Sequence, residues 1–361
     1  MRKARWLATW QDSSSKPVIY HCVSRVVDRR FVFGERECEA FRMYLRMYEN
    51  FSGCRVLSSC LMSNHFHLLL EVPPMAEGGL PDEALLQRLS GLYSEAFVAG
   101  VAAELAESRK SKVDGGGADI RVAEIHARFT YRMHDLSQFM KGLLIRFTRW
   151  FNRTHNRTGT LWEERFKSVI VESGVAARTM AAYIDLNPVR AGMVSDPADY
   201  RWSGYGEAVG GGAKGNGKKA KMGLILTVRN PGSRDQIPID SWEEVSRIYR
   251  RAMGLALVRK SGRAGAVISV HATMNEAEYL EGATEDRLHL PDLGMAGMLS
   301  KRVRYFTDGA VIGSKAFVNE AFDEARQRFT ERRKDGARRM RGSGAPAKGV
   351  LWSMRDLRVG V

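Results

Sequence analysis

Two histidines that could hold a divalent metal ion are separated by one residue, in the segment His65-Phe66-His67. Residues 65–72 are mostly apolar and end before two prolines, which predicts a β-strand. Alternate side chains of a strand point to the same face, so the two imidazoles would lie side by side, with Phe66 on the opposite face. Neutral imidazoles suit manganese and zinc, and with phosphate oxygens they can serve magnesium. The alternative interpretation is two half-buried polar residues at a strand edge.

A tyrosine and an asparagine one helical turn apart form the second candidate feature. Residues 175–186 predict a helix that closes at Asn187-Pro188, and positions i and i+4 of a helix share a face, so Tyr183 and Asn187 would project together. A tyrosine hydroxyl has a pKa near ~10, so it needs help to act as a nucleophile. A metal ion that polarises a phosphate supplies part of that help, and the Asn187 oxygen could be its third ligand. The alternatives are a core tyrosine and an N-cap asparagine before Pro188.

Between these features, basic residues alternate with aromatic ones. Guanidinium and ammonium groups contact phosphates, whereas aromatic rings stack on unpaired bases. The whole chain has 56 Lys and Arg against 41 Asp and Glu, a net charge of +15, which also fits a polyanion partner. The alternative is a solvated helix face with buried rings. The predicted DNA contacts are Arg146, Arg149, Arg153, Arg157, Arg165, Lys167 and, beyond this stretch, Arg190.

The elements that must position these residues follow from hydrophobic spacing. The first part of the chain predicts a strand, a helix and two further strands, at 18–26, 35–51, 55–62 and 65–72. A helical insertion follows at about 73–130, with one long helical stretch over 81–110. Beyond it the spacing predicts an amphipathic helix over 136–151 and a fourth strand over 165–172.

A glycine- and lysine-rich segment, 207–225, predicts a flexible basic linker between two domains. The first domain would cover residues 1–206. The second, 226–361, predicts a mainly helical region with a basic tail. Its segment 308–318 could belong to a DNA-binding helix-turn-helix, with Ser314 as the N-cap of the second helix.

The location of the protein is predicted from what the sequence lacks. The N-terminal segment shows no apolar core of about 7–15 residues as in a signal peptide, and no apolar run approaches the ~18 residues of a membrane span. None of the four cysteines forms a Cys-x-x-Cys pair. We therefore expect reduced thiols and a cytoplasmic, nucleoid-associated protein without a membrane partner.

These motifs together resemble a family of transposases. His65-Phe66-His67 is similar to the His-hydrophobic-His (HUH) motif of single-tyrosine transposases that act on single-stranded DNA. Residues 159–168 and the segment 183–192 (YIDLNPVRAG) are similar to the REP-associated tyrosine transposases. The resemblance covers about residues 16–206. The insertion and the region after 206 depart from the compact pattern of the family.

The resemblance implies an α+β fold, a ferredoxin-like or RRM-like antiparallel sheet with helices on one side. It implies that His65, His67 and Asn187 bind Mg²⁺ or Mn²⁺ and that Tyr183 attacks a phosphate of hairpin-forming single-stranded DNA. The products would be a 5′-phosphotyrosine and a free 3′-OH, which a reversal of the step rejoins. Such an enzyme would act in DNA transposition or repeat processing, as a monomer or a homodimer.

Two other functions stay open at this point. One is a catalytically idle, domesticated DNA-binding protein that keeps the RRM-like fold. The other is a metal-dependent hydrolase in which His65 and His67 hold an ion that activates water, so that cleavage would survive Tyr183→Phe. The intact set of two histidines and a tyrosine favours the transposase.

Overall fold

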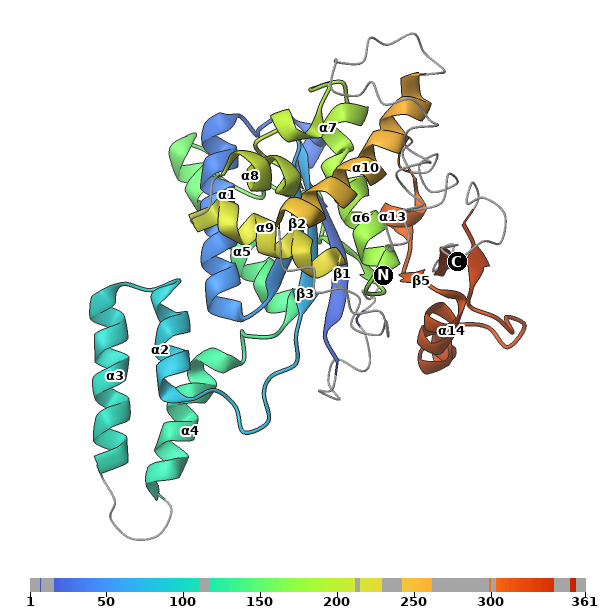
Figure 1. Cartoon of the computed structure of the whole chain (residues 1–361). Helices are drawn as coiled ribbons and strands as arrows, with labels where there is room; N and C mark the ends of the chain where they lie inside the picture. Colours follow the sequence, from blue (N-terminus) through green and yellow to red (C-terminus); the bar gives the residue numbers. More distant parts are fainter. Residues whose placement is uncertain are drawn as a thin grey trace.

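A seven-stranded sheet forms the centre of the molecule (Figure 1). The computed structural model describes residues 7, 16–110, 117–211, 215–228, 242–261, 299, 303–340 and 351–354. In order across the sheet the strands are β2 (Arg55–Leu61), β3 (His65–Val72), β1 (Val18–Arg25), β4 (Lys167–Val171), β5 (Val311–Gly313), β7 (Trp352–Met354) and β6 (Arg338–Arg339).

The first four strands have the order and directions of an RRM-like sheet. β1 pairs antiparallel with both β3 and β4, and β2 pairs antiparallel with β3. Helix α1 (Glu35–Ser52) connects β1 to β2, and α5 (Leu136–Thr154) precedes β4. Both helices pack on one face of the sheet, in a core that includes Phe66, Leu68 and Leu70 of β3. The predicted α+β class is therefore confirmed.

The ends of these two helices follow from their sequences. The Glu37 carboxylate accepts a hydrogen bond from the Gly34 N–H at the start of α1, and Gly53 ends the helix with φ of 74°. Asp135 caps α5 by accepting from the Gln138 N–H at 2.6 Å. These residues fix both ends of α1 and the start of α5.

Helices also cover the second face of the sheet, where the resemblance implied helices on one side only. The helix over the catalytic candidates is α6 (Val175–Asp185), which contacts β2, β3 and β4. Around it lie α7 (Asn187–Arg190), α8 (Gly204–Gly210), α9 (Gly215–Val228), α10 (Trp242–Ser261) and α13 (Tyr305–Asp308). Short 3₁₀ helices lie at Val27–Arg29, Pro197–Asp199 and Arg326–Arg328.

The predicted flexible linker at 207–225 is wrong for the residues that the structure describes, which leave out 212–214. These residues finish α8 and form most of α9, whose Ala220, Leu224 and Ile225 are buried against the core. Gly223 packs so closely on β2 that a Cβ would lie 2.4 Å from the Val56 carbonyl oxygen. The glycines thus permit close packing here rather than a free chain.

The C-terminal region extends the same sheet instead of forming a separate helical domain. β5 pairs parallel with β4, and β7 and β6 follow antiparallel. The predicted helix-turn-helix at 308–318 is also wrong, because the β-branched, fully buried Val311 and Ile312 form a strand there. Ser314 does cap α14 (Lys315–Glu324), accepting from the Phe317 N–H at 3.2 Å. The predicted basic tail, residues 326–348, is described up to residue 340, where it forms a 3₁₀ helix at Arg326–Arg328 and β6; residues 341–348 lie outside the described residues.

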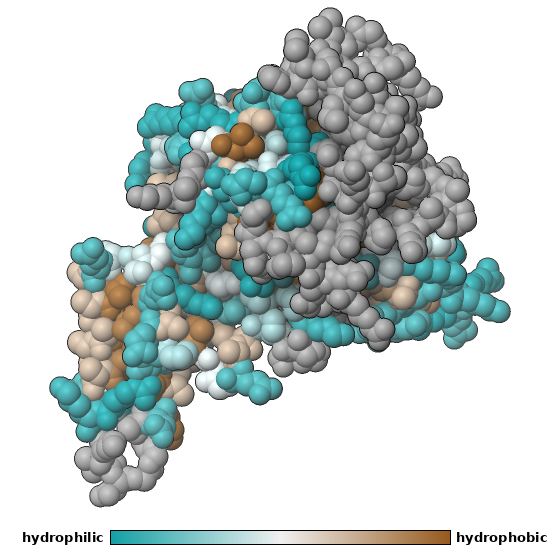
Figure 2. Space-filling model, in the orientation of Figure 1, coloured by the Kyte–Doolittle hydropathy of each residue, from teal (hydrophilic) through white to brown (hydrophobic). Residues whose placement is uncertain are grey.

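Helices α2 (Asp82–Ser90), α3 (Glu95–Lys110) and α4 (Gly117–Thr130) form an arm that projects from the body of the molecule (Figure 1). The predicted continuous helical stretch over 81–110 is broken at residues 91–94. The arm has a core of its own, and apolar surface also remains on its outside (Figure 2), where Phe97 and Ile120 are exposed. Within the described part of the chain, no helix has the length and apolar character needed to cross a membrane.

Candidate catalytic site

The two histidines of the HUH motif lie on the same face of β3. His67 is 3% exposed and His65 is half-buried, and their ring centroids are 5.1 Å apart at an interplanar angle of 73°. β3 lies between β1 and β2, so its fixed pairing on both sides holds the two rings in place. Phe66 points into the opposite core, as the alternation of a strand requires.

The hydrogen bonds of these histidines determine which ring nitrogen carries the proton. His65 Nδ1 lies 2.7 Å from the side-chain oxygen of Asn64, which can only accept. The proton of His65 is therefore on Nδ1, and the lone pair is on Nε2. Such a partner on the other nitrogen is typical of metal-binding histidines.

A third histidine, His21 of β1, fixes the proton of His67. His21 Nδ1 donates to the Phe306 carbonyl oxygen at 2.6 Å, and its Nε2 lies 2.9 Å from His67 Nδ1. Burial lowers the pKa of His21 to about 4, so at neutral pH the ring has a single proton, which the carbonyl requires on Nδ1. His21 Nε2 therefore accepts, and His67 donates from Nδ1 and keeps its lone pair on Nε2.

Replacing His21 with leucine is expected to weaken Mn²⁺ binding by about 10- to 100-fold, the usual effect of removing an outer partner of a metal ligand. His21→Gln keeps an oxygen acceptor for His67 and is expected to recover part of the affinity. Calorimetric titration with Mn²⁺ in the absence of DNA measures both. Cys22→Ala, on the opposite face of the same strand, is the packing control. Wild-type affinity in His21→Leu would show that His21 has no positioning role.

The donors present fit a divalent ion, with two imidazole Nε2 atoms on one strand face. In the described ranges no cluster of three or more His, Cys, Asp or Glu side chains could hold a metal ion. A third protein ligand would therefore have to be of another type, and the amide oxygen of Asn187 is the predicted one.

Tyr183 lies over the HUH strand. Its ring is perpendicular to that of His67, with centroids 6.4 Å apart, and the ring of Phe306 packs on it at 4.6 Å. Only 2% of Tyr183 is exposed, so the tyrosine is both beside the histidines and part of the core. A phosphate could reach its hydroxyl only after a shift of the surrounding side chains.

Arg190, one of the predicted DNA contacts, lies against Tyr183. Its guanidinium carbon is 4.1 Å from the centroid of the Tyr183 ring. The guanidinium donates to the Tyr183 carbonyl oxygen, to Asn187 Oδ1 at 2.8 Å and to the Leu299 carbonyl oxygen at 2.8 Å. Burial lowers its pKa. The Asn187 oxygen is thus turned to Arg190, and Leu186 rather than Asn187 is the N-cap of α7.

Asp185 faces away from Tyr183 and anchors α6 to its neighbours. Its carboxylate accepts hydrogen bonds from Tyr249 Oη at 2.6 Å, from the Tyr205 N–H at 3.0 Å and from Ser58 Oγ at 3.2 Å. Burial raises its pKa from 3.8 to about 6. The position is structural, and it ties α10 to the helix that carries Tyr183.

The raised pKa of Asp185 makes a pH-dependent contribution to stability. Because the folded state binds this proton more tightly than the unfolded state, stability from this group falls as pH rises from about 4 to 6.5, by roughly 3 kcal/mol in total. Asp185→Asn is expected to remove that slope while keeping an oxygen acceptor. Urea unfolding of both proteins at pH 5 and pH 7 measures it. Equal pH dependence in the two proteins would contradict the assignment.

The other predicted DNA contacts do not all lie on one side of the sheet. Arg146, Arg149 and Arg153 lie on α5, on the far side of the sheet from Tyr183. Lys167 of β4 lies on the Tyr183 side, because it and His67 are both paired with Val23 of β1. Arg165 is exposed just before β4, and Arg157 donates to the Thr160 carbonyl oxygen at 3.1 Å.

Sequence reasoning missed two contributors to the site, Arg25 and Phe306. Arg25 of β1 is paired directly with His65, so it adds a cation on the same sheet face. The alternation along β1 was a usable signal for Arg25, and it also places His21 on this face. Phe306 had no signal, because it reaches Tyr183 and His21 from a segment more than 100 residues away.

Residues 14–78 match the model of a protein family described as Transposase IS200 like. The matched segment contains β1, α1, β2 and β3, and with them both histidines of the HUH motif. Over this segment, the match confirms the predicted resemblance to single-tyrosine transposases of the IS200-like kind. Tyr183 and the rest of the chain lie outside it.

Among solved structures, the chain is similar to one described as "Structure of the REP associates tyrosine transposase bound to a REP hairpin". The two are 12% identical, with 60% of this chain and 90% of that chain covered, at a TM-score of 0.32. A likeness at this TM-score adds no support to the family match. No curated protein matches the chain.

Proposed function

We propose that the protein is a metal-dependent transposase that cuts and rejoins single-stranded hairpin DNA through Tyr183. The observation that carries the proposal is the position of the Tyr183 ring over His67, in a site where hydrogen bonds set both HUH histidines with their lone pairs on Nε2. The family match over the HUH strand supports the same class of reaction.

In the proposed step, the Tyr183 oxygen attacks a backbone phosphorus and forms a bond to it, while the bond from phosphorus to the 3′ oxygen breaks. The tyrosine proton is lost, the leaving 3′ oxygen gains a proton, and the 5′ phosphate stays on the tyrosine. Attack by a 3′-OH reverses the step and joins two strands. A bound Mg²⁺ or Mn²⁺ would polarise the phosphate.

The residues around the tyrosine would each have a part in this step. His65 and His67 would hold the ion. Asn187, the proposed third ligand, would first have to turn its oxygen away from Arg190. Arg190 would offset the negative charge that develops between the tyrosine and the phosphate, because a cation partly shielded from water acts strongly there. Arg25 and Lys167, on the same sheet face, would contact neighbouring phosphates of the strand.

The test is an adduct assay with the full chain. The protein is incubated with labelled single-stranded hairpin DNA from repeats that flank its gene, with Mg²⁺ or Mn²⁺, and analysed on a denaturing gel. A labelled protein band and a free 3′-OH fragment are expected. Cleavage without a protein band would favour the hydrolase instead, and tight binding without cleavage would favour a domesticated DNA-binding protein.

The second candidate function is this catalytically idle DNA-binding protein. It is favoured by one observation, the 2% exposure of Tyr183 beneath Phe306 and Arg190. In such a protein the tyrosine would serve only as a core residue. The hydrolase has less support, since the described residues contain no third carboxylate, cysteine or histidine that completes a metal cluster.

A further inference from the structure

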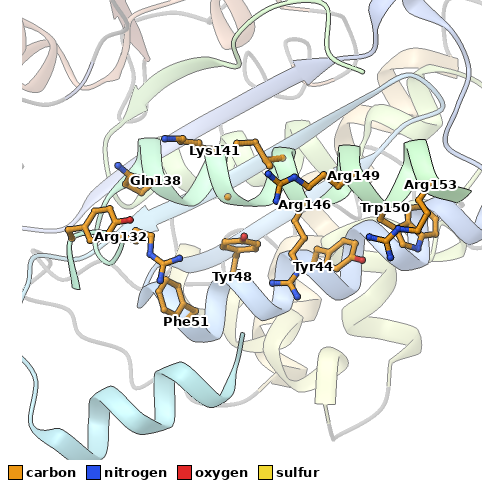
Figure 3. Close-up of a pocket in the computed structure, with 13 residues that line it drawn as sticks. Tyr44, Tyr48, Phe51, Arg132, Gln138, Lys141, Arg146, Arg149, Trp150 and Arg153 are labelled. Carbon is orange, nitrogen blue, oxygen red and sulfur yellow. The ribbon is translucent and has the colours of Figure 1, made fainter. Parts of the chain in front are cut away.

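A groove of about 510 Å³ runs along the outside of the molecule between α1 and α5 (Figure 3). Five cations line it, and none of its lining residues is acidic. The cations come from α5 and from the segment just before it, namely Arg132, Lys141, Arg146, Arg149 and Arg153. Such a concentration of positive charge favours a polyanionic ligand.

Aromatic rings share this groove with the cations. Tyr44 and Tyr48 of α1 point into it between the arginines, and Trp150 lies at one end beside Arg153 (Figure 3). The Arg146 guanidinium lies 5.7 Å from the Tyr44 ring centroid, and Tyr131 is 63% exposed at the rim. Tyr44, Tyr48 and Trp150 are half-buried, so each offers part of its ring to the groove. Rings set among cations are the arrangement that binds unpaired bases by stacking and their phosphates by charge.

A glycine shapes the floor of the groove. Gly142 of α5 faces Tyr48, and a Cβ at this position would lie 2.3 Å from the tyrosine ring. The absence of a side chain therefore lets the Tyr48 ring lie against α5 and keeps the space above it open. The groove is thus formed by the packing of the two helices, not by a loop.

The groove is separate from the candidate catalytic site. α1 and α5 cover one face of the sheet, whereas His67 and Tyr183 lie with α6 on the other. A nucleotide held between these two helices could not contact Tyr183, because the sheet lies between them. Any strand that occupies the groove is therefore distinct from the phosphate under attack.

We propose that this groove is a second, non-catalytic site for single-stranded DNA, which holds a few unpaired nucleotides by stacking and by phosphate contacts. The choice of DNA as the polyanion rests on the proposed function. The choice of an unpaired strand rests on the rings, because a base in a duplex exposes only its edges.

The test measures fluorescence anisotropy of a labelled ten-residue oligothymidylate with the full chain. Lys141→Glu/Arg149→Glu changes two exposed cations of the groove and is expected to weaken binding by at least tenfold. It should also reduce the slope of the logarithm of the binding constant against the logarithm of the salt concentration by about 1.4, at about 0.7 per lost phosphate contact on a single strand. Tyr131→Ala, which keeps the charge, is expected to weaken binding by about fivefold or more through lost stacking.

A matched control changes the same charge elsewhere. Lys110→Glu/Arg121→Glu alters two exposed cations of the arm and is expected to leave the affinity within about twofold of wild type. An equal loss in both double variants would overturn the proposal, because the effect would then reflect net charge alone. Tighter binding of a duplex of the same length, or equal binding of polyglutamate, would also overturn it.

The adduct assay separates this proposal from the proposed function. The wild type and the arm variant Lys110→Glu/Arg121→Glu, given saturating hairpin DNA, are expected to form the tyrosine adduct, because the arm is remote from Tyr183 (Figure 1). If adducts form but the groove variants bind oligothymidylate normally, the groove proposal alone fails. If the groove variants lose binding and no adduct forms in any protein, the catalytic proposal alone fails.

Discussion

Replacing Tyr183 with phenylalanine is expected to abolish the covalent adduct and DNA cleavage, by at least about 10⁴-fold, because its hydroxyl is the proposed nucleophile. The change removes one oxygen atom and keeps the ring. The ring's contacts with His67, Phe306 and the Arg190 guanidinium should therefore persist, and the protein should fold and bind DNA as before. Single-turnover cleavage on a denaturing gel measures the loss.

Tyr200→Phe is the matched control for Tyr183→Phe. Tyr200 is also buried on this side of the sheet, where its hydroxyl donates to the Leu61 carbonyl oxygen. Loss of that hydrogen bond should cost about 1 kcal/mol of stability and leave cleavage unchanged. Cleavage that survives in Tyr183→Phe would contradict the tyrosine mechanism.

Replacing Arg190 with alanine is expected to slow cleavage by about 10²- to 10³-fold, the usual effect of removing one group that stabilises a transition-state charge. The sequence alone predicted that Arg190 contacts a DNA phosphate, and the loss of such a contact would have a different effect on binding and rate. A lost phosphate contact weakens DNA binding and lowers the salt slope, with little change in the rate at saturating DNA. The half-buried position of Arg190 against Tyr183 predicts the opposite, a lower saturated rate with nearly unchanged affinity.

Because Arg190 makes three hydrogen bonds to the chain, its alanine variant must first be shown to fold, by a thermal melt. Arg190→Lys keeps the charge but not the planar set of donors, and should lie between wild type and Arg190→Ala in rate. Arg157→Ala is the control for the loss of a DNA contact away from the tyrosine, because Arg157 contacts Thr160 and Phe151. A normal saturated rate in both Arg190 variants would rule out the catalytic part.

Much of the RRM-like core could be predicted from local pattern. The strands at 55–61 and 65–72 and the helix at 35–52 match their predicted bounds within a residue. The helix has a period of 3.6 in its apolar residues, the strands are short runs rich in apolar residues, and all three are bounded by glycine, proline or a short polar turn. The same local rule placed His65 and His67 on one face, because alternation in a strand requires no knowledge of its neighbours.

The far side of the molecule could not be predicted in this way. The glycines and lysines of 207–225 have the composition of a linker, yet most of α9 forms there. The helix packs directly on β2 because Gly223 has no side chain at the point of contact. Val311 and Ile312 form a strand because the edge of β4 is available for pairing. Both outcomes depend on partners far away in the sequence.

The sequence by itself determined the class of fold and the placement of His65 and His67 on one face of a strand. It also indicated that Tyr183 lies on a helix. These features depend only on residue type and short spacing. The tertiary structure decided which side chains complete the site. It placed His21 behind His67, Phe306 on Tyr183 and Arg190 against both Tyr183 and Asn187. It also placed the arginines of α5 on the opposite side, because α5 packs on α1 and the other face of the sheet. Such contacts join segments up to 285 residues apart, and no local period records them.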